Sequence, residues 1–186
     1  MPTTILSKMT LLLLLFFTGI QIEAQTLMEE KLDLRGAILK TQTKSLENIE
    51  VRNPLNRSRV RMQSKVLTLS LPDSNQIYHA LQLSATTLSG VQYIDPDELP
   101  HAIHFLKVLE REYPTDSRPD SNDDIKYVTY GGMEMQFRYN RKYERWELFI
   151  SLDSNKQYFN VVISLDKVPD FINILQQAIN YIDDQN

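Results

Sequence analysis

Apolar and polar residues alternate most regularly in the second half of the chain. Gly131 and Gly132 stand there between two alternating runs, a pattern typical of a two-residue hairpin turn. Because side chains alternate along each strand, such a hairpin puts one set of side chains in the core and the other set on an outer face. Counting outward from the glycines predicts four cross-strand pairs: Tyr130 with Met133 and Val128 with Met135 on one face, and Thr129 with Glu134 and Tyr127 with Gln136 on the outer face.

A second hairpin is expected to turn at residues 153–156, which read Asp-Ser-Asn-Lys. A slip of one residue would move every side chain of this hairpin to the other face. The pattern therefore predicts an antiparallel sheet with one buried face. The expected register joins large apolar residues: Ile150 with Phe159, Leu148 with Val161, and Trp146 with Ile163.

Each half of the chain ends in an amphipathic helix. The helices are expected to begin at residues 97–100 and 166–169, because each run places Asp as an N-cap before a Pro in the first turn. The similar runs are consistent with a duplicated strand-strand-helix unit. Shared turn and capping chemistry is the alternative explanation, since Asp-Ser-Asn also recurs at residues 120–122.

Together these patterns predict an α+β fold, a largely antiparallel sheet with two amphipathic helices on one face. Residues 36–186 are expected to form a single domain, with halves at 36–113 and 125–186 joined by an exposed linker at 114–124. Residues 25–35 are polar and are expected to form a loose N-terminal arm. The first half should hold strands near residues 36–43, 59–71, 76–87 and 91–94. The predicted core contains Leu106, Val128, Met135, Trp146, Leu148, Val161, Ile163 and Leu175.

Residues 1–24 have the pattern of a secretory signal peptide. Lys8 precedes the apolar run Leu11 to Phe17, and Ala24 supplies the small residue needed at a cleavage site. The run is shorter than the roughly 20 apolar residues that span a bilayer, and no second run follows it. We therefore expect a mature chain that begins near Gln25, has no transmembrane segment and works in the periplasm or at the cell surface. The sequence contains no cysteine, so the folded state must depend on its apolar core.

Basic residues gather between residues 51 and 65, although the net charge of -4 argues against nucleic acid as a partner. An anionic glycan, lipid head group or protein could bind there. The favoured explanation is instead an edge strand protected from aggregation by outward charges. Because Arg59 and Arg61 share odd numbering with the later leucines of this run, a bulge is expected between Gln63 and Val66. The basic residues are Arg52, Arg57, Arg59, Arg61 and Lys65.

The outer face of the second half carries rings beside hydrogen-bonding groups, an arrangement that suits a sugar or an extended peptide. Ordinary cross-strand pairing on a solvated face is the alternative. The candidate ligand-binding residues are Tyr127, Gln136, Arg138, Glu147, Phe149, Tyr158 and Asn160.

No catalytic residue, metal site or cofactor is predicted. The chain contains no phosphate-binding Gly-Lys loop, nucleophile elbow or zinc-protease motif. Asp97, His101 and His104 share one face of the first helix, but this face lies opposite the apolar residues and should point to solvent.

The run Tyr93 to Leu99, followed by a tyrosine-rich meander and a last helix, resembles uncharacterised secreted proteins of Bacteroidota-type bacteria. The resemblance implies an α+β fold and an extracytoplasmic location, and no catalytic residue. The leading hypothesis is a noncatalytic binding protein whose partner is an envelope protein, a peptide or a glycan. The alternative is a small secreted hydrolase of glycans or peptides, with carboxylates placed by the fold. Oligomeric state has no signal in the sequence.

Overall fold

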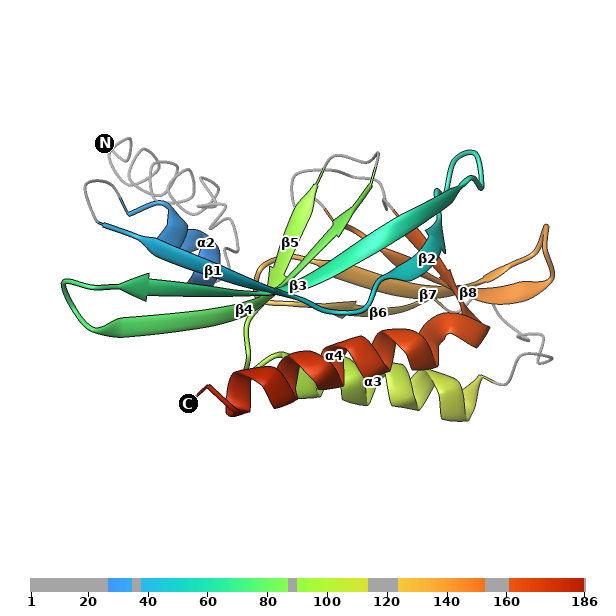
Figure 1. Ribbon diagram of the computed structural model, residues 1–186. Helices are drawn as coiled ribbons and strands as arrows, with labels where there is room; N and C mark the ends of the chain where they lie inside the picture. Colours follow the sequence, from blue (N-terminus) through green and yellow to red (C-terminus); the bar gives the residue numbers. More distant parts are fainter. Residues whose placement is uncertain (1–26, 35–37, 87–89, 114–123, 153–160, 186) are drawn as a thin grey trace, which may run out of the picture.

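The computed structural model describes residues 27–34, 38–86, 90–113, 124–152 and 161–185, which form one sheet and its helices (Figure 1). The helices are α2 (Leu27–Leu32), α3 (Leu99–Glu112) and α4 (Val168–Asp183), with a short 3₁₀ helix η1 (Leu165–Lys167) before α4. The strands are β1 (Lys40–Ser45), β2 (Ile49–Arg52), β3 (Arg59–Leu71), β4 (Gln76–Ala85), β5 (Val91–Ile94), β6 (Ile125–Val128), β7 (Glu134–Asn140), β8 (Arg145–Ile150) and β9 (Val161–Ser164).

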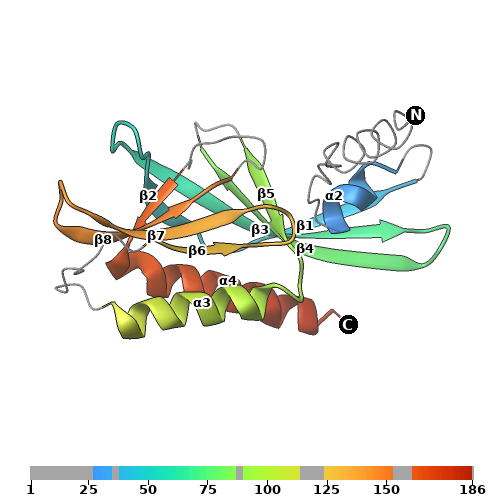
Figure 2. The same ribbon diagram turned by 180° about the vertical axis from the view of Figure 1, so that it is seen from behind.

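The strands pair in the order β5-β4-β3-β2-β9-β8-β7-β6, and β1 pairs with β3 next to β2. Each strand pairing is antiparallel. Helices α3 and α4 lie side by side on one face of the sheet, as Figures 1 and 2 show from opposite sides. The predicted α+β class is therefore confirmed. We call this face the helix face and the opposite one the outer face.

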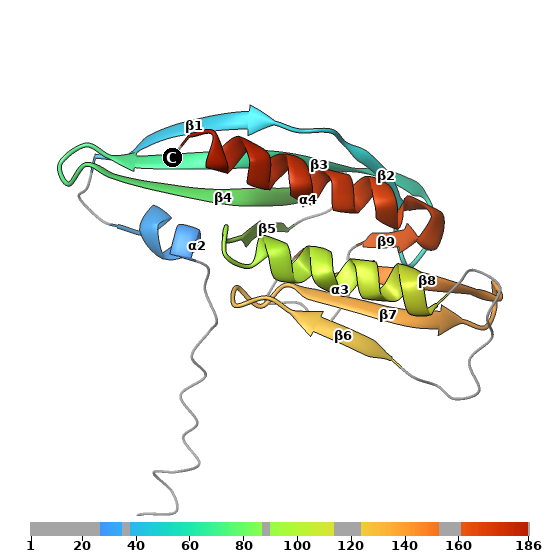
Figure 3. The same ribbon diagram turned by 90° about the horizontal axis from the view of Figure 1, so that it is seen from below.

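The two helices interlock the halves of the chain. Helix α3 belongs to the first half, yet its Phe105 stacks on Tyr127 of β6, and Tyr113 just after it meets Trp146 of β8 edge to face. Helix α4 belongs to the second half and packs against β3 and β4. Figure 3 shows this exchange from below, with α4 over β3 and β4 and α3 over β7. One continuous apolar core results, and it draws on both halves.

Most of the predicted core is confirmed. Phe137 and Trp146 stack with their ring centroids 4.8 Å apart on the helix face. Val128 is the exception, because its side chain is 48% exposed. The predicted residues that are buried are Leu106, Met135, Trp146, Leu148, Val161, Ile163 and Leu175.

The error at Val128 comes from the turn between β6 and β7. Thr129 and Met133 close this turn around three residues, not two, and Gly132 has a φ of 77°. A three-residue loop that ends in a left-handed glycine is a common hairpin turn. The register consequently moves by one residue: Tyr127 pairs with Met135, and Val128 pairs with Glu134.

The second predicted register is shifted by two residues. Leu148 pairs with Ile163 and Ile150 with Val161, so the partners differ from those expected. Because side chains alternate with a period of two, this shift leaves every residue on its predicted face. The predicted turn at 153–156 and Phe159 lie outside the described residues.

Strand β3 has no bulge, contrary to expectation. Its register with β4 is continuous from Met62 to Leu71. The buried side changes along the strand because each face is covered at a different place. Val60, Met62 and Val66 pack under the helices, whereas Leu67 and Leu69 pack on the outer face.

The cover over Leu67 and Leu69 is α2, which replaces the predicted loose arm. Met28 of α2 is 1% exposed and joins Leu67, Leu69 and Ala80 in a second apolar cluster. The backbone N–H of Leu27 donates to Asp95 Oδ2 at 2.8 Å. Residues 25–35 are too weakly patterned to predict a helix, but one buried methionine and one carboxylate hold residues 27–32 in place.

The helix starts and the first strands also differ in detail. Helix α3 begins at Leu99 and α4 at Val168, without a side-chain cap from the predicted aspartates. Strand β1 begins at Lys40, four residues later than expected, and β2 was not predicted. The linker proposed at 114–124 falls, except for Asp124, outside the described residues.

Candidate ligand-binding face

The structure brings four of the seven candidate residues together. Gln136 pairs with Phe149 and Arg138 with Glu147 across β7 and β8, and all four side chains belong to the outer face. Tyr158 and Asn160 lie outside the described residues. Tyr127 belongs to the opposite face.

The position of Tyr127 corrects the predicted aromatic platform. The shift in the β6–β7 register turns the tyrosine toward α3, where its ring lies 5.4 Å from that of Phe105. Burial, followed by the nearby charge of Glu98, raises the pKa of Tyr127 to about 12. This side chain therefore contributes to helix packing and is not part of an outer surface.

Phe149 lies on the predicted face but is only 4% exposed. The guanidinium of Arg138 lies 3.9 Å from the centroid of its ring, which is cation–π geometry. The outer face of β7 and β8 therefore presents polar groups above a buried ring. An exposed platform of flat rings is not formed by the described candidates.

Glu147 is the centre of a buried ionic cluster. Its side chain is fully buried, and Oε2 accepts hydrogen bonds from Arg57 at 3.1 Å and from Asn140 at 2.7 Å. Oε1 accepts from Arg145 Nε at 2.9 Å and from a second nitrogen of Arg57. Burial alone would raise the pKa of Glu147, but the hydrogen bonds from Arg57, Asn140 and Arg145 outweigh it and hold the pKa below its ordinary value.

Arg57 reaches this cluster from a different hairpin. It lies in the β2–β3 turn, one residue before its end, and has a φ of 61°, a left-handed conformation that is uncommon outside glycine and asparagine. Its guanidinium also lies 4.7 Å from the ring of Tyr143, in the β7–β8 turn. Arg57 thus ties two hairpins together, and a contact over 90 residues of sequence has no local signal.

A strip of basic side chains lies on the outer face of β2 and β3. Arg52 and Arg59 are directly opposite each other in the antiparallel pair, and Arg61 follows on the same face. A guanidinium nitrogen of Arg59 lies 3.5 Å from a carboxylate oxygen of Glu50. Arg52, Arg61 and Lys65 have no ion pair with any described residue. We call Arg52, Arg59, Arg61 and Lys65 the basic strip.

The protected-edge explanation for these residues is wrong, because β3 is a central strand. It pairs with β2 and β1 on one side and with β4 on the other. The basic strip therefore covers part of a sheet face and does not guard an open edge.

The basic strip and the Arg138–Glu147 region share the outer face. Strand β2 joins β9 through the pair Arg52 and Val162, and β9 joins β8. Sequence reasoning found the two regions separately but could not place them on one surface, since residues 52 and 162 meet only in the folded sheet.

Two buried carboxylates near the start of α3 were not predicted as functional. Asp95 binds the backbone of α2, and Glu98 Oε1 accepts the backbone N–H of Tyr130 in the β6–β7 turn. Burial raises the pKa of both groups. They fasten two segments to the end of β5. The lone pattern Asp-Pro-Asp-Glu indicates a helix start, so their structural role was not visible in sequence.

Asp97, His101 and His104 are exposed, as their helix periodicity indicates. Within the described residues, no group of three or more histidine and acidic side chains is placed to hold a metal ion. No described helix is both long and apolar enough to cross a membrane.

Comparison with protein-family models and with curated proteins finds no match for this chain.

Proposed function

We propose that this chain is a noncatalytic binding protein of the bacterial periplasm or cell surface, with its outer face as the site for an anionic glycan or peptide. The single observation that carries this proposal is the pairing of Arg52 with Arg59. Two like charges directly opposite each other destabilise an antiparallel pair, by roughly 0.2–1 kcal/mol.

Stability alone does not explain this arrangement. A solvated sheet face needs only polar side chains, and Gln63 on the same strand shows that a neutral residue fits there. Arg61 is exposed and lacks an ion pair within the described part of the chain. An anionic ligand laid across β2 and β3 would neutralise the repulsion and form charge-assisted hydrogen bonds with the guanidinium groups.

The buried carboxylate of the same face is poorly suited to acid–base catalysis, which favours binding over the alternative of a hydrolase. Glu147 is the buried carboxylate of the Arg138 region, and its two oxygens are held by Arg57, Asn140 and Arg145. Its lowered pKa keeps it ionised at neutral pH, so it is not a general acid.

The test measures binding to two polyanions, polygalacturonate as an acidic glycan and polyglutamate as an acidic peptide, with neutral dextran as the blank. Arg52→Gln should weaken binding several-fold and leave folding stability unchanged or slightly raised, because it removes a repulsive neighbour of Arg59. Lys44→Gln is the matched control, since this exposed residue of β1 carries the same charge outside the strip. Binding should also fall with added salt.

Equal weakening by Arg52→Gln and Lys44→Gln would show that net charge alone is responsible. A destabilised Arg52→Gln protein that still binds normally would mean that Arg52 is a structural residue. Either result would overturn the proposal. A pull-down from envelope extracts with the native protein and Arg52→Gln would then identify the natural ligand among those lost by the variant.

A further inference from the structure

Two hairpin turns form one end of the molecule. The β2–β3 turn, residues 53–58, and the β7–β8 turn, residues 141–144, both project at the end opposite the β3–β4 turn (Figures 1 and 2). Arg57 joins them, because it binds Glu147 and lies against Tyr143. We call these two turns the paired tips.

The first tip presents an apolar side chain to solvent. Leu55 is 87% exposed, more than the other exposed large apolar residues of the described chain. The turn around it is held by its own side chains: Asn53 Oδ1 accepts the N–H of Leu55 at 2.8 Å, and Asn56 Oδ1 accepts the N–H of Ser58 at 3.0 Å. A rigid turn therefore holds Leu55 out from the sheet.

The paired tips also carry cationic and aromatic side chains. The two turns with their flanking residues, 53–58 and 140–147, contain four basic side chains and two acidic ones. One of the acids, Glu147, is buried and forms ion pairs with two of the basic residues, Arg57 and Arg145. Tyr143 is 40% exposed, and its ring lies 5.4 Å from the Lys142 ammonium.

We propose that the paired tips bind the surface of an anionic phospholipid bilayer. Leu55 would enter the boundary between head groups and acyl chains, Tyr143 would lie at the head-group level, and Lys142 would meet lipid phosphates. An acidic protein could match the cations, but it would also need a pocket shaped for Leu55. A bilayer can accept one apolar side chain from a tip that also carries cationic side chains, and it needs no such pocket.

This inference goes beyond the proposed function and takes from it only the envelope location. The residues it needs, Leu55 and Lys142, are not part of the basic strip. Variants of one surface can therefore be tested for the activity of the other.

The experiment uses the protein purified after export, so that its N-terminus is the one the cell produces. Co-sedimentation is measured with vesicles of phosphatidylcholine alone and of equimolar phosphatidylglycerol and phosphatidylcholine. The protein should bind the anionic vesicles and not the neutral ones. Leu55→Ser should lower the partition coefficient about tenfold, as expected for withdrawing a leucine from apolar contact. Lys142→Glu should lower it by a similar factor, because it replaces an attraction with a repulsion.

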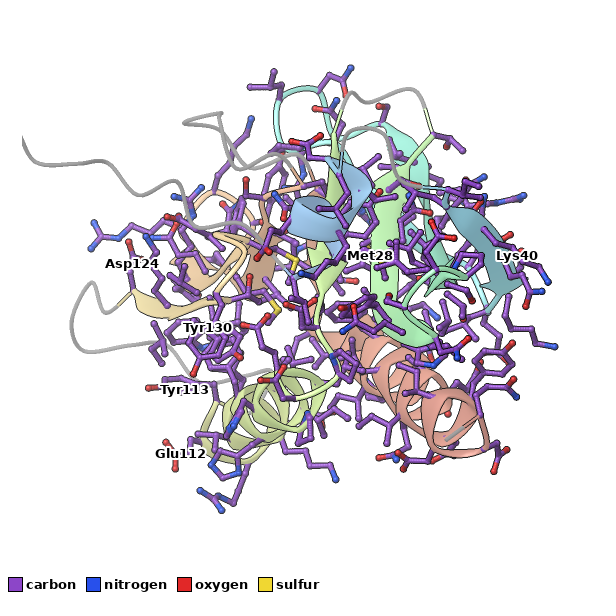
Figure 4. All side chains as sticks on the ribbon, turned by 90° about the vertical axis from the view of Figure 1, so that its left-hand side faces the viewer. Met28, Lys40, Glu112, Tyr113, Asp124 and Tyr130 are labelled. Carbon is purple, nitrogen blue, oxygen red and sulfur yellow. The ribbon has the colours of Figure 1, made fainter. Side chains whose placement is uncertain are left out.

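Two matched controls lie at the opposite end of the molecule. Ile77 is 59% exposed at the start of β4. Lys40 is exposed at the start of β1, and Figure 4 labels it in a view from that end. Ile77→Ser and Lys40→Glu should leave the partition coefficient within about twofold. Equal losses in tip and control variants would overturn the proposal, as would an absence of binding to anionic vesicles. Leu55→Ser should still bind polyanions at the outer face. Polyanion binding by this variant therefore distinguishes a failure of the membrane proposal from a failure of the proposed function.

Discussion

At the residue scale, Glu147 is a fully buried carboxylate between Trp146 and Leu148, and its charge is balanced by Arg57 and Arg145. Trp146 and Leu148 lie on their predicted face because alternation within one strand decides it. Glu147 was placed correctly between them, yet its burial depends on Arg57, which belongs to a distant hairpin. A polar residue in an alternating strand is expected at the solvent, and only the fold shows that it is fully buried.

Glu147→Gln should destabilise the protein by about 3 kcal/mol, because it leaves Arg57 and Arg145 without their counter-charge. This is the lower part of the usual range, since Arg145 is 31% exposed. The pKa of Glu147 is lower in the folded state, so its stabilisation is present above about pH 4.5 and is lost as the pH falls through the folded pKa. Urea unfolding from neutral to acidic pH should therefore show the two proteins converging at low pH.

Glu50→Gln is the control for this change, because the Glu50–Arg59 pair is exposed and should contribute about 0–1 kcal/mol. Burial raises the pKa of Asp95 and Glu98, so these groups destabilise the folded state at neutral pH, and this destabilisation is lost as the pH falls. They are present in both proteins, and the difference curve cancels them. A constant difference at all pH values would contradict the assigned role of Glu147.

At the element scale, turn chemistry decides the register, and the glycine pair was insufficient to do so. Two glycines are compatible with a two-residue loop and with a three-residue loop that ends in a left-handed residue. The choice depends on the closing bonds of Thr129 with Met133. One residue of difference moved Tyr127 inward and Val128 outward. In strand β3 the predicted bulge was wrong for a different reason. Helix α2 covers the outer side of the strand, so the buried face can change without a bulge.

The two registers make opposite predictions for neighbouring residues. Tyr127→Ala should destabilise the protein by about 2 kcal/mol, less than the 3–5 kcal/mol of a fully buried aromatic residue, since Tyr127 is half-buried against Phe105. Val128→Ala should change the free energy of unfolding by less than about 0.5 kcal/mol, because Val128 is exposed. Chemical denaturation of both variants decides between the registers. A larger effect at Val128 would restore the two-residue turn.

At the scale of the whole molecule, the sequence predicts the fold class because periodicity reports the type of each element. Periodicity does not report which strands are neighbours within the sheet. The pairing of β2 with β9 and the exchange of α3 and α4 between the halves join residues far apart in the chain. Neither leaves a local pattern. The basic strip and the Arg138 region therefore became one candidate site only when the strand order was known. The duplicated unit remains a hypothesis.

The exchange of helices predicts that both halves unfold in one transition. Trp146 is the single tryptophan and reports on the second half, where it touches Tyr113 from the first. Leu81 is fully buried in the first half, on β4. Leu81→Ala should destabilise the protein by about 2–5 kcal/mol as a large-to-small core change. If α3 and α4 couple the halves, the urea midpoint of Trp146 fluorescence must fall as far as that of far-ultraviolet circular dichroism. A fluorescence midpoint that stays in place while circular dichroism shifts would show two units that unfold independently, and the single domain over residues 36–186 would be wrong.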